Sequence, residues 1–589
     1  MKRFYTSLLG LLMTISLAAA DVQGWPANYE GVMLQGFYWN SFSDTKWTNL
    51  ESQASELAQY FNLIWVPQSG YCNSLTNQMG YSDIWWFDQK SCFGTAAELK
   101  SMISTFKDKG LLTIADVVIN HKNGNTNWCD FPTETWNGQT MTWSLADICQ
   151  TDEAKAKGYA VTGNADTGDD FNGCRDLDHT SANVQKNIKL YLQFLQEEMG
   201  YAGFRYDMTG GYAPAYTKIY NESATPEFSV GEYWKDDGLT GLQGWIDGTG
   251  MTSAAFDFQL KWLINNAFNN SSWSQLANLS TQSLIGSGYN RYAVTFVDNH
   301  DTGRDSGNML KANVEAANAY ILTMPGTPCV WLTHWQGFKT QIKKLITARK
   351  LAGINNQSKI ITNNGSSEGY YVRVRGTKGD LMLVLGNIAP QMSGFKLATE
   401  GTNYKLYISE SIDISDIENI EDDTFIAPSF CTWDDNETCA FFEAPSTWTA
   451  PIRCWAWNSS LNYTDGNWNT STTCTLVGTA DNGNKVYKWT WNGKCYNNGK
   501  TTETTPQGSP TGIIFHNSSQ QTADFDFTNG GYYNYSGKQG IVTGISNITI
   551  DGNLSGKHND NAIYNLAGQR VDKTYKGIVI QNGKKIVIK

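Results

Sequence analysis

The spacing of hydrophobic and polar residues divides the chain into two parts. Between Gly31 and Gly353, short apolar runs alternate with longer segments whose apolar residues recur every three or four positions. The short runs indicate buried strands and the longer period indicates amphipathic helices. The expected strands are Val32–Tyr38, Leu63–Pro67, Leu111–Val118, Gly203–Asp207, Phe228–Glu232, Ala254–Phe258, Ala293–Asp298 and Cys329–Thr333. Eight strands alternating with helices predict an α/β fold, a closed (β/α)₈ TIM barrel.

Helical periodicity is clearest at Thr95–Lys109, Ser181–Met199 and Gln341–Leu351, and Thr95 with Glu98 has the spacing of a capping box. One connection is far longer than the others. Residues 121–180, between the third strand and its helix, are rich in Gly, Asn, Asp and Trp. A loop of this length is normally functional or forms an inserted subdomain.

After residue 353 the helical period ends and alternating or apolar strand patterns follow. We expect a β domain at 354–445, a second, Trp-rich β module at 446–542, and a small β tail at 543–589. The catalytic barrel would then span residues 21–353, and both β domains are expected to be sandwich-like.

The first 20 residues have the pattern of a secretion signal. Lys2 and Arg3 precede an apolar run from Leu8 to Leu17, and three alanines end the segment. The run is too short to span a bilayer. We expect an exported protein, extracellular, periplasmic or attached to the cell surface, without a transmembrane segment.

Composition narrows the possible partners. The net charge is −12 and there is no basic run, which argues against binding to nucleic acid. Aromatic residues reach 13%, including 22 Trp, and flat aromatic faces suit sugar rings. The chain has no CxxC or HExxH pattern, so a zinc site is not expected. We expect a monomer.

Three acids stand at or just beyond the ends of predicted strands: Asp207, Glu232 and Asp301. The carboxyl-terminal ends of barrel strands carry the active site in this fold. Arg205 with Asp207 alone is more often an ordinary ion pair. Three acids with Arg205 and His300 nearby are harder to explain as structural.

The acids have the residue types that a retaining glycosidase needs, one carboxylate to attack and one protonated carboxyl to release the leaving oxygen. Asp207 beside Arg205 would stay ionised and suits the nucleophile. Glu232 has Val230, Tyr233 and Trp234 as sequence neighbours, and apolar surroundings raise the pKa of a carboxyl, as an acid/base requires. Asp301 would stabilise the positive charge of the transition state.

Four ordered stretches then give a specific resemblance. Residues 116–121 (DVVINH), 203–207 (GFRYD), 231–232 (GE) and 296–301 (FVDNHD) resemble the signature stretches of the α-amylase family, glycoside hydrolase family thirteen. Residues 34–39 and 79–82 are similar to plant and liquefying bacterial members. The resemblance covers about residues 28–445. It implies the three catalytic roles above, with Tyr81, His121, Arg205 and His300 around the sugar.

The resemblance also implies a structural Ca²⁺ between the barrel and the insertion. Hard cations prefer several oxygen ligands, and residues 168–179 are rich in Asp and Asn. The expected ligands are Asn120, Asp170, Asp176 and the carbonyl of Gly211. The alternative is a solvated acidic turn. One position departs from the family pattern, because Gly210 stands where many members have Lys or Arg.

The Trp-rich module resembles starch-binding modules of carbohydrate-binding family twenty-six, and Trp455, Trp457 and Trp468 are its candidate sugar contacts. The tail resembles sorting tails of exported bacterial proteins. These resemblances imply a secreted α-amylase that hydrolyses internal α-1,4 bonds of starch. Two alternatives stay open: a related α-glucan hydrolase or transglycosylase, and a non-catalytic starch-binding protein, which the three acids argue against.

Overall fold

The computed structural model describes residues 22–421, 425, 427–434, 436–480, 483–517 and 519–542, together with four strands of the tail. Residues 1–21, which include the expected secretion signal, lie outside this description. Among the described residues, no helix is long and apolar enough to cross a membrane.

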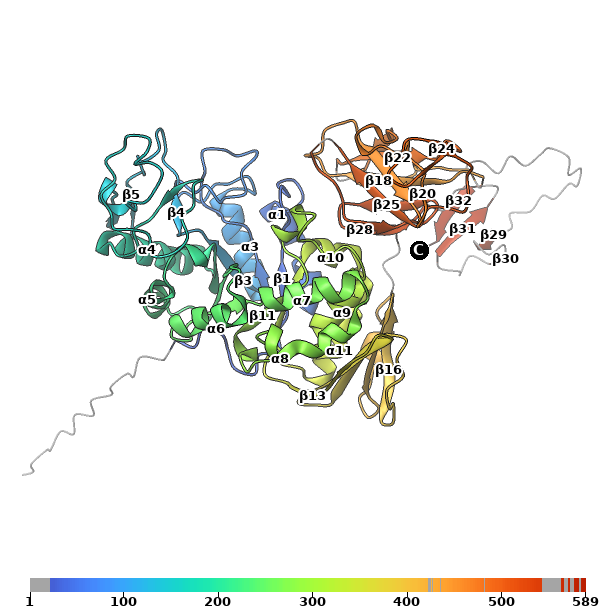
Figure 1. Ribbon diagram of the computed structural model, residues 1–589, viewed down its shortest axis with the longest axis horizontal. Coiled ribbons are helices and arrows are strands. Elements are labelled where there is room, and N and C mark those ends of the chain that lie inside the picture. Colours follow the sequence, from blue (N-terminus) through green and yellow to red (C-terminus); the bar gives the residue numbers. More distant parts are fainter. Residues whose placement is uncertain are drawn as a thin grey trace, which may run out of the picture.

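The predicted barrel is confirmed. Eight parallel strands close in the order β1-β12-β11-β10-β9-β8-β3-β2 (Figure 1). Their bounds are β1 Met33–Gln35, β2 Leu63–Trp65, β3 Leu112–Val117, β8 Gly203–Tyr206, β9 Phe228–Gly231, β10 Ala254–Phe256, β11 Ala293–Phe296 and β12 Thr327–Trp331. Each of these strands ends one to three residues earlier than the sequence pattern suggested. Asp207 and Glu232 are therefore the first residues beyond β8 and β9.

Helices cover the outside of the barrel. They are α1 Trp47–Ser52, α2 Ala54–Tyr60, α3 Ala96–Asp108, α4 Ala182–Phe194, α5 Pro214–Ala224, α6 Gly238–Gly248, α7 Phe258–Asn269, α8 Leu279–Gln282, α9 Val314–Thr323, α10 Leu332–Gly337 and α11 Lys339–Ala352. The capping box of α3 forms as predicted, with Thr95 and Glu98 exchanging hydrogen bonds. After α4 the chain continues as a short π-helix, Leu195–Met199, in place of one uninterrupted helix.

The long connection after β3 carries little regular structure. Its strands are β4 His121–Lys122, β5 Glu134–Trp136, β6 Gln139–Met141 and β7 Arg175–Asp176. β4 pairs with β7, so the two ends of the insertion are joined where it leaves the barrel. Because β4 follows β3 closely, the insertion lies at the carboxyl-terminal end of the barrel strands.

Beyond the barrel, a five-stranded antiparallel sheet has the order β13-β14-β15-β17-β16. Its strands are β13 Lys359–Gly365, β14 Gly369–Arg375, β15 Asp380–Gly386, β16 Phe395–Gly401 and β17 Tyr404–Ser409, and the short helix α12 Ser415–Glu418 follows. The apolar faces of β14 and β15 belong to the same hydrophobic core as the barrel.

Two further sheets form the β module, with the orders β21-β22-β18-β27-β28 and β24-β23-β20-β19-β25-β26. The strands are β18 Cys439–Ala444, β19 Arg453–Trp457, β20 Leu461–Asn462, β21 Thr475–Thr479, β22 Lys485–Thr490, β23 Cys495–Asn497, β24 Glu503–Thr504, β25 Gly512–His516, β26 Phe525–Asp526, β27 Gly531–Asn534 and β28 Gly537–Ile541. β18 lies inside the first of these sheets. The β module therefore begins before residue 446, the boundary that was expected from the start of the Trp-rich composition.

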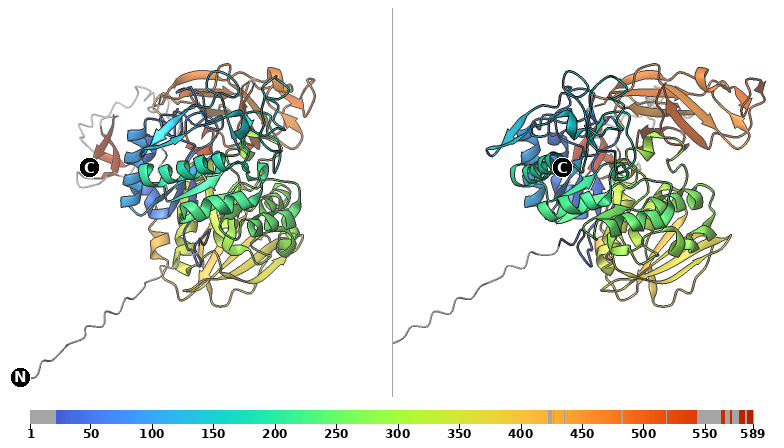
Figure 2. Two further views of the ribbon diagram at one scale, coloured as in Figure 1. Left: turned by 90° about the vertical axis from the view of Figure 1, so that its left-hand side faces the viewer. Right: turned by 60° about the vertical axis from the view of Figure 1, so that its left-hand side comes forward.

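In the tail, β29 Ile563–Asn565, β30 Arg570–Val571, β31 Gly577–Gln581 and β32 Lys584–Ile588 form a separate four-stranded sheet. The insertion and the β module both lie toward one end of the barrel, and the five-stranded sheet lies at the opposite end (Figure 2). Tyr38, just beyond β1, stacks on Tyr535 of the module with ring centroids 5.3 Å apart. The module thus contacts the end of the barrel where the strand-end acids are found.

Candidate active site

One buried guanidinium joins three carboxylates at the ends of adjacent strands. Arg205 on β8 contacts Asp207 at 2.6 Å and Asp116 of β3 at 2.8 Å through Nη1, and Glu232 at 2.7 Å through Nη2. β8 pairs with β3 on one side and β9 on the other, which brings these side chains together. Arg205 is fully buried, so its charge is poorly screened and holds the carboxylates in a fixed arrangement.

Glu232 occupies an environment that favours its protonated form. Burial raises the pKa of Glu232 well above its usual value of 4.5, and the charges of Asp207 and Asp301 act in the same direction, while Arg205 opposes them. The backbone N–H of Met208 donates to Glu232 Oε2 at 3.1 Å and fixes the carboxyl beside Asp207. A carboxyl that stays protonated near neutral pH can act as a general acid.

A chain of hydrogen bonds links His300, Tyr81 and Asp116. The amide of Gln35 lies 2.9 Å from His300 Nδ1, His300 Nε2 lies 2.7 Å from the Tyr81 hydroxyl, and that hydroxyl donates to Asp116 at 2.8 Å. Burial lowers the pKa of His300, so the ring is neutral. With Gln35 donating to Nδ1, the proton of His300 resides on Nε2 and is donated to Tyr81.

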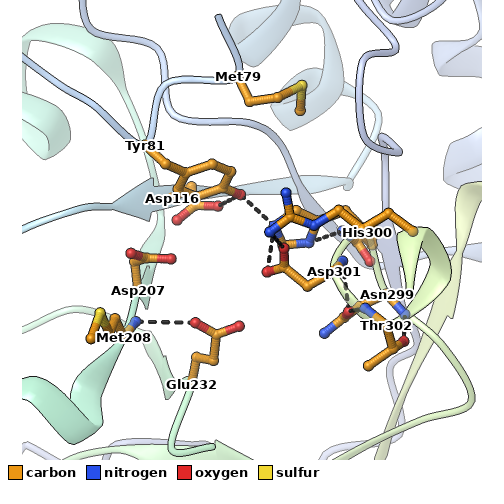
Figure 3. A network of polar contacts seen from close by, with 12 residues as sticks. Met79, Tyr81, Asp116, Asp207, Met208, Glu232, Asn299, His300, Asp301 and Thr302 are labelled. Atoms are coloured by element: carbon orange, nitrogen blue, oxygen red, sulfur yellow. Dashed lines mark hydrogen bonds and ion pairs between the residues drawn. The ribbon is translucent and has the colours of Figure 1, made fainter. Parts of the chain in front are cut away.

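Asp301 completes the group of acids. Its carboxylate lies 3.2 Å from His300 Nε2 and 2.8 Å from Arg304, and its backbone N–H donates to Asn299 Oδ1 at 2.9 Å. Burial raises the pKa of Asp301. The carboxylates of Asp207, Glu232 and Asp301 approach one space from different sides, beside the Tyr81 ring (Figure 3). The structure therefore brings the three predicted acids together.

His121 lies at the edge of this space. Its Nε2 is 2.9 Å from the backbone carbonyl of Tyr81, and its ring stacks on Phe171 of the insertion with centroids 4.3 Å apart. Burial lowers the pKa of His121. His121 thus connects the insertion to the loop that carries Tyr81.

The structure adds residues that sequence reasoning did not assign to the site. Asp116 shares Arg205 with Asp207, and Gln35 sets the tautomer of His300. Trp39 stacks on Tyr81 with an angle of 4° between the rings, and the guanidinium of Arg304 lies 3.6 Å from the Trp39 ring centroid. Asp116 and Gln35 could have been identified from sequence, because each lies within a predicted barrel strand and within one of the stretches that resemble the family.

A cluster of acids fits a cation near the insertion. Ligand oxygens of Asp166, Asp170 and Asp176 lie within 4.8 Å of one another. Asn120 Nδ2 lies 3.2 Å from Asp176, and a Cβ at Gly211 would be 2.1 Å from Asn120 Oδ1, so the Gly211 backbone directly abuts Asn120. Burial and neighbouring carboxylates raise the pKa of Asp176 to about 9. Crowded carboxylates and amide oxygens are a donor set that Ca²⁺ prefers. Asp166 was not predicted.

A lysine from another strand end lies over Gly210. A Cβ at position 210 would be 3.1 Å from Lys235 Cδ, so the Lys235 side chain occupies the space above this glycine. Lys235 Nζ forms an ion pair with Asp169 at 2.8 Å and lies 3.4 Å from the Gly210 carbonyl. A cation is therefore present beside Gly210, contributed by the chain that follows Glu232.

The candidate aromatics of the module lie on and beside β19. Trp455 and Trp468 lie together, with ring centroids 5.6 Å apart and an angle of 56° between the rings, and Trp468 stacks on His516 at 4.0 Å. Trp457, two residues further along β19, packs over Gly512. Trp455 and Trp457 are two residues apart on one strand and therefore share a face of the sheet.

Comparison with known proteins gives consistent results. The family model described as the alpha-amylase catalytic domain matches residues 61–368. The chain is 31% identical over 396 residues to "Probable alpha-amylase 2" of Arabidopsis thaliana, covering 64% of this chain and 93% of that protein. It is 29% identical over 422 residues to a glucan 1,4-alpha-maltotetraohydrolase of Stutzerimonas stutzeri, covering 64% and 73%. An Anoxybacillus alpha-amylase structure matches its fold with a TM-score of 0.50 and 15% identity, covering 65% of this chain and 98% of that one.

Proposed function

Because the chain belongs to the alpha-amylase family and is a glycoside hydrolase, we propose that it cleaves internal α-1,4-glucosidic bonds of starch and related α-glucans with retention. The observation that carries this proposal is the pair of carboxylates, Asp207 and Glu232, on adjacent nitrogens of Arg205. Two acids held this close, one paired with Arg205 Nη1 and one with a raised pKa, suit a double displacement.

In the first step Asp207 attacks the anomeric carbon and forms a covalent glycosyl ester. Glu232 gives its proton to the glycosidic oxygen as that C–O bond breaks. In the second step Glu232, now ionised, takes a proton from water, whose oxygen displaces Asp207. Asp301 stabilises positive charge on the ring in both transition states, and Tyr81, His121 and His300 contact the sugar.

The test compares the wild type with Asp207→Asn in reducing-sugar release from soluble starch and from pullulan. We expect release from starch and a loss of several orders of magnitude in the variant. Asp108→Asn is a matched control, because Asp108 is exposed on α3. Near-normal activity of a folded Asp207→Asn protein would contradict the nucleophile assignment, and products longer than the substrate would favour the transglycosylase alternative.

Retention can be checked directly by proton NMR of the first products. A retaining enzyme releases the α-anomer, which then mutarotates, whereas an inverting enzyme releases the β-anomer. Early accumulation of the β-anomer would exclude the covalent step on Asp207 and leave the assignment of the family unaffected.

We further propose that Asn120, Asp166, Asp170, Asp176 and the Gly211 carbonyl hold a structural Ca²⁺. A bound cation would neutralise the crowded carboxylates and join the insertion to the chain that follows β8. Chelation with EDTA should lower the melting temperature of the wild type, and Asp166→Asn should reduce this effect, whereas Asp108→Asn should not. An unchanged melting temperature on chelation would count against the site.

Export is the final part of the proposal and rests on the sequence pattern of residues 1–20. It predicts that the mature protein begins near residue 21, which N-terminal sequencing of protein from the medium or periplasm would reveal. A mature protein that begins at Met1 would contradict it. The proposed partner is an α-glucan, and the proposed state is a monomer.

A further inference from the structure

The loop that follows β1 contacts both the β module and the candidate active site. We call residues 36–46 the β1 loop. The Ser41 N–H donates to the Tyr38 carbonyl at 3.1 Å, and the Tyr38 N–H donates to Ser41 Oγ at 3.3 Å. Asn40 between them has a φ of 67°. This is the pattern of a type II β-turn, with Asn at the position that needs a positive φ. A displacement of Tyr38 therefore moves Trp39, the other central residue of the turn.

On the module side, the ring of Tyr38 stacks on Tyr535. The two ring centroids are 5.3 Å apart, and the angle between the rings is 28°. Trp448 packs edge-on against Tyr535 with centroids 6.1 Å apart, so the module also fixes this ring from its own side. The hydroxyls of Ser43 and Ser446 lie 2.7 Å apart. The module therefore holds the β1 loop at two points, Tyr38 and Ser43.

On the opposite side of the turn, Trp39 packs against the group of residues beside the acids. Its ring lies within 4° of parallel to the Tyr81 ring, with centroids 5.8 Å apart, and its centroid is 6.1 Å from that of His300. The Arg304 guanidinium lies 3.6 Å from the Trp39 ring centroid and pairs with Asp301 at 2.8 Å. Trp39 thus contacts both the Tyr81 ring and the cation that pairs with Asp301.

The backbone of the same turn contacts the segment that carries Tyr81. The Asn40 N–H donates to Met79 Sδ at 3.2 Å, two residues before Tyr81. The barrel holds the loop on both sides of the turn, because Trp331 donates to the Phe37 carbonyl at 3.1 Å and Phe42 packs on Phe93. Loss of the module contact should therefore shift the turn without unfolding the loop, and a moderate effect on the active site is expected.

We propose that Tyr535 of the β module is a positioning residue for cleavage of the glycosidic bond. It acts through the turn at Tyr38 and Trp39, which supports the Tyr81 ring and the cation beside Asp301. This inference rests on the proposed function, which assigns the sugar contact to Tyr81 and charge stabilisation to Asp301. Small displacements of such groups slow the reaction, because the transition state requires a fixed geometry. Docking of the module is thus part of how the active site is built.

The test is a double-mutant cycle in the full-length protein, measured as kcat/KM on maltopentaose. Tyr535→Ala should lower kcat/KM about fivefold, the size of one lost aromatic contact. In the Trp39→Ala background the same change should have no further effect, because the residue that transmits the contact is absent. An equal loss in both backgrounds would overturn the proposal, since Tyr535 would then act only on the stability of the module. An unchanged kcat/KM in Tyr535→Ala would also overturn it.

Two further variants separate the ring of Tyr535 from general loosening of the module. Tyr535→Phe keeps the stacked ring and should retain the kcat/KM of the wild type. Ser536→Ala removes the neighbouring hydrogen bond, which the Ser536 hydroxyl donates to Gln336 of α10 at 2.7 Å, and should leave kcat/KM unchanged. Equal losses in Ser536→Ala and Tyr535→Ala would overturn the specific role of the ring.

A measurement without substrate separates this inference from the proposed function. Amide hydrogen exchange in peptides that cover residues 36–46 should be faster in Tyr535→Ala than in the wild type and in Tyr535→Phe. Unchanged exchange would overturn the positioning role, even in a protein that hydrolyses starch. Absence of starch hydrolysis by the wild type would instead contradict the proposed function, while faster exchange in Tyr535→Ala would still support the contact between the module and the β1 loop.

Discussion

At the scale of single residues, Glu232 determines how the site responds to pH. In the proposed mechanism Glu232 must be protonated to release the leaving group, and its raised pKa keeps it protonated far above pH 4.5. Activity should therefore persist through neutral pH and fall as the pH rises through this raised value. We expect the alkaline limb of the kcat/KM profile on soluble starch to lie well above pH 4.5. An alkaline limb near 4.5 would contradict the buried acid.

Lys235, which lies over Gly210, should affect the affinity of the proposed Ca²⁺ site. Lys235 contacts both the Gly210 carbonyl and Asp169. These two residues directly precede Gly211 and Asp170, which are proposed Ca²⁺ ligands. Lys235→Met should loosen this link, and an ion pair of partial exposure is worth up to about 1 kcal/mol, or up to about fivefold in Ca²⁺ affinity. The measurement is the Ca²⁺ concentration that gives half of the rise in melting temperature.

Lys218→Met is a matched control for this change, because Lys218 forms an exposed ion pair with Glu222 on α5 and none with the described residues of the insertion. An equal shift in both variants would mean that net charge, and not the Lys235 link, sets the Ca²⁺ affinity.

The sequence could predict the acids because each lies at or within a few residues of the end of an apolar strand, where side chains converge in a barrel. It could not predict Asp166, which lies in a stretch without regular structure, ten residues before Asp176. Nor could it show that Lys235 covers Gly210, because this contact depends on how the chain leaves β9. Both residues are placed by tertiary packing, which local periodicity does not encode.

At the scale of elements, a buried ion pair supports the segment that carries Asp301. Lys261 of α7 contacts Asp298 at 2.7 Å, and both side chains are completely buried. Asp298 also accepts from Thr302 Oγ1 at 3.0 Å, and Thr302 Oγ1 accepts from the Asn299 N–H at 3.0 Å. The pair thus fixes the turn between β11 and the start of the next segment.

Replacing only one partner of this pair should be costly. Lys261→Met would leave Asp298 charged and uncompensated, which lowers the free energy of unfolding by about 3–5 kcal/mol. Urea denaturation measures this loss. Lys261→Met combined with Asp298→Asn should recover part of it, since no uncompensated charge remains. If the loss of stability in the double variant equals the sum of the losses in Lys261→Met and Asp298→Asn measured separately, the two residues are not coupled.

The elements themselves were largely predictable, and the exceptions have physical causes. All eight barrel strands have apolar runs that differ from the helical period around them. The division of Ser181–Met199 into α4 and a π-helix was not predictable, because the apolar spacing continues across it. The sequence also could not show that β18 belongs to the module, because its partners in the sheet, β22 and β27, are distant in the sequence.

At the scale of the whole molecule, β18 decides where the polypeptide can be cut. It pairs with β22 on one side and with β27 on the other. Ala440 and Phe442 face one hydrophobic core of the module, Phe441 faces another, and all three are fully buried. A protein that ends at residue 445 would keep this strand without either neighbour or either core, and such an edge promotes aggregation.

A protein that ends at Ile420, after α12, would retain the barrel and the five-stranded sheet with Ile417 in their shared core. We expect it to elute as a monomer, to hydrolyse soluble starch and to bind granular starch more weakly than the full chain. The protein ending at residue 445 should form large species in the same column. Equal behaviour of the two would contradict this expectation. Of these two positions, only a cut after Ile420 leaves both parts of the enzyme intact, although the change in composition lies near residue 445.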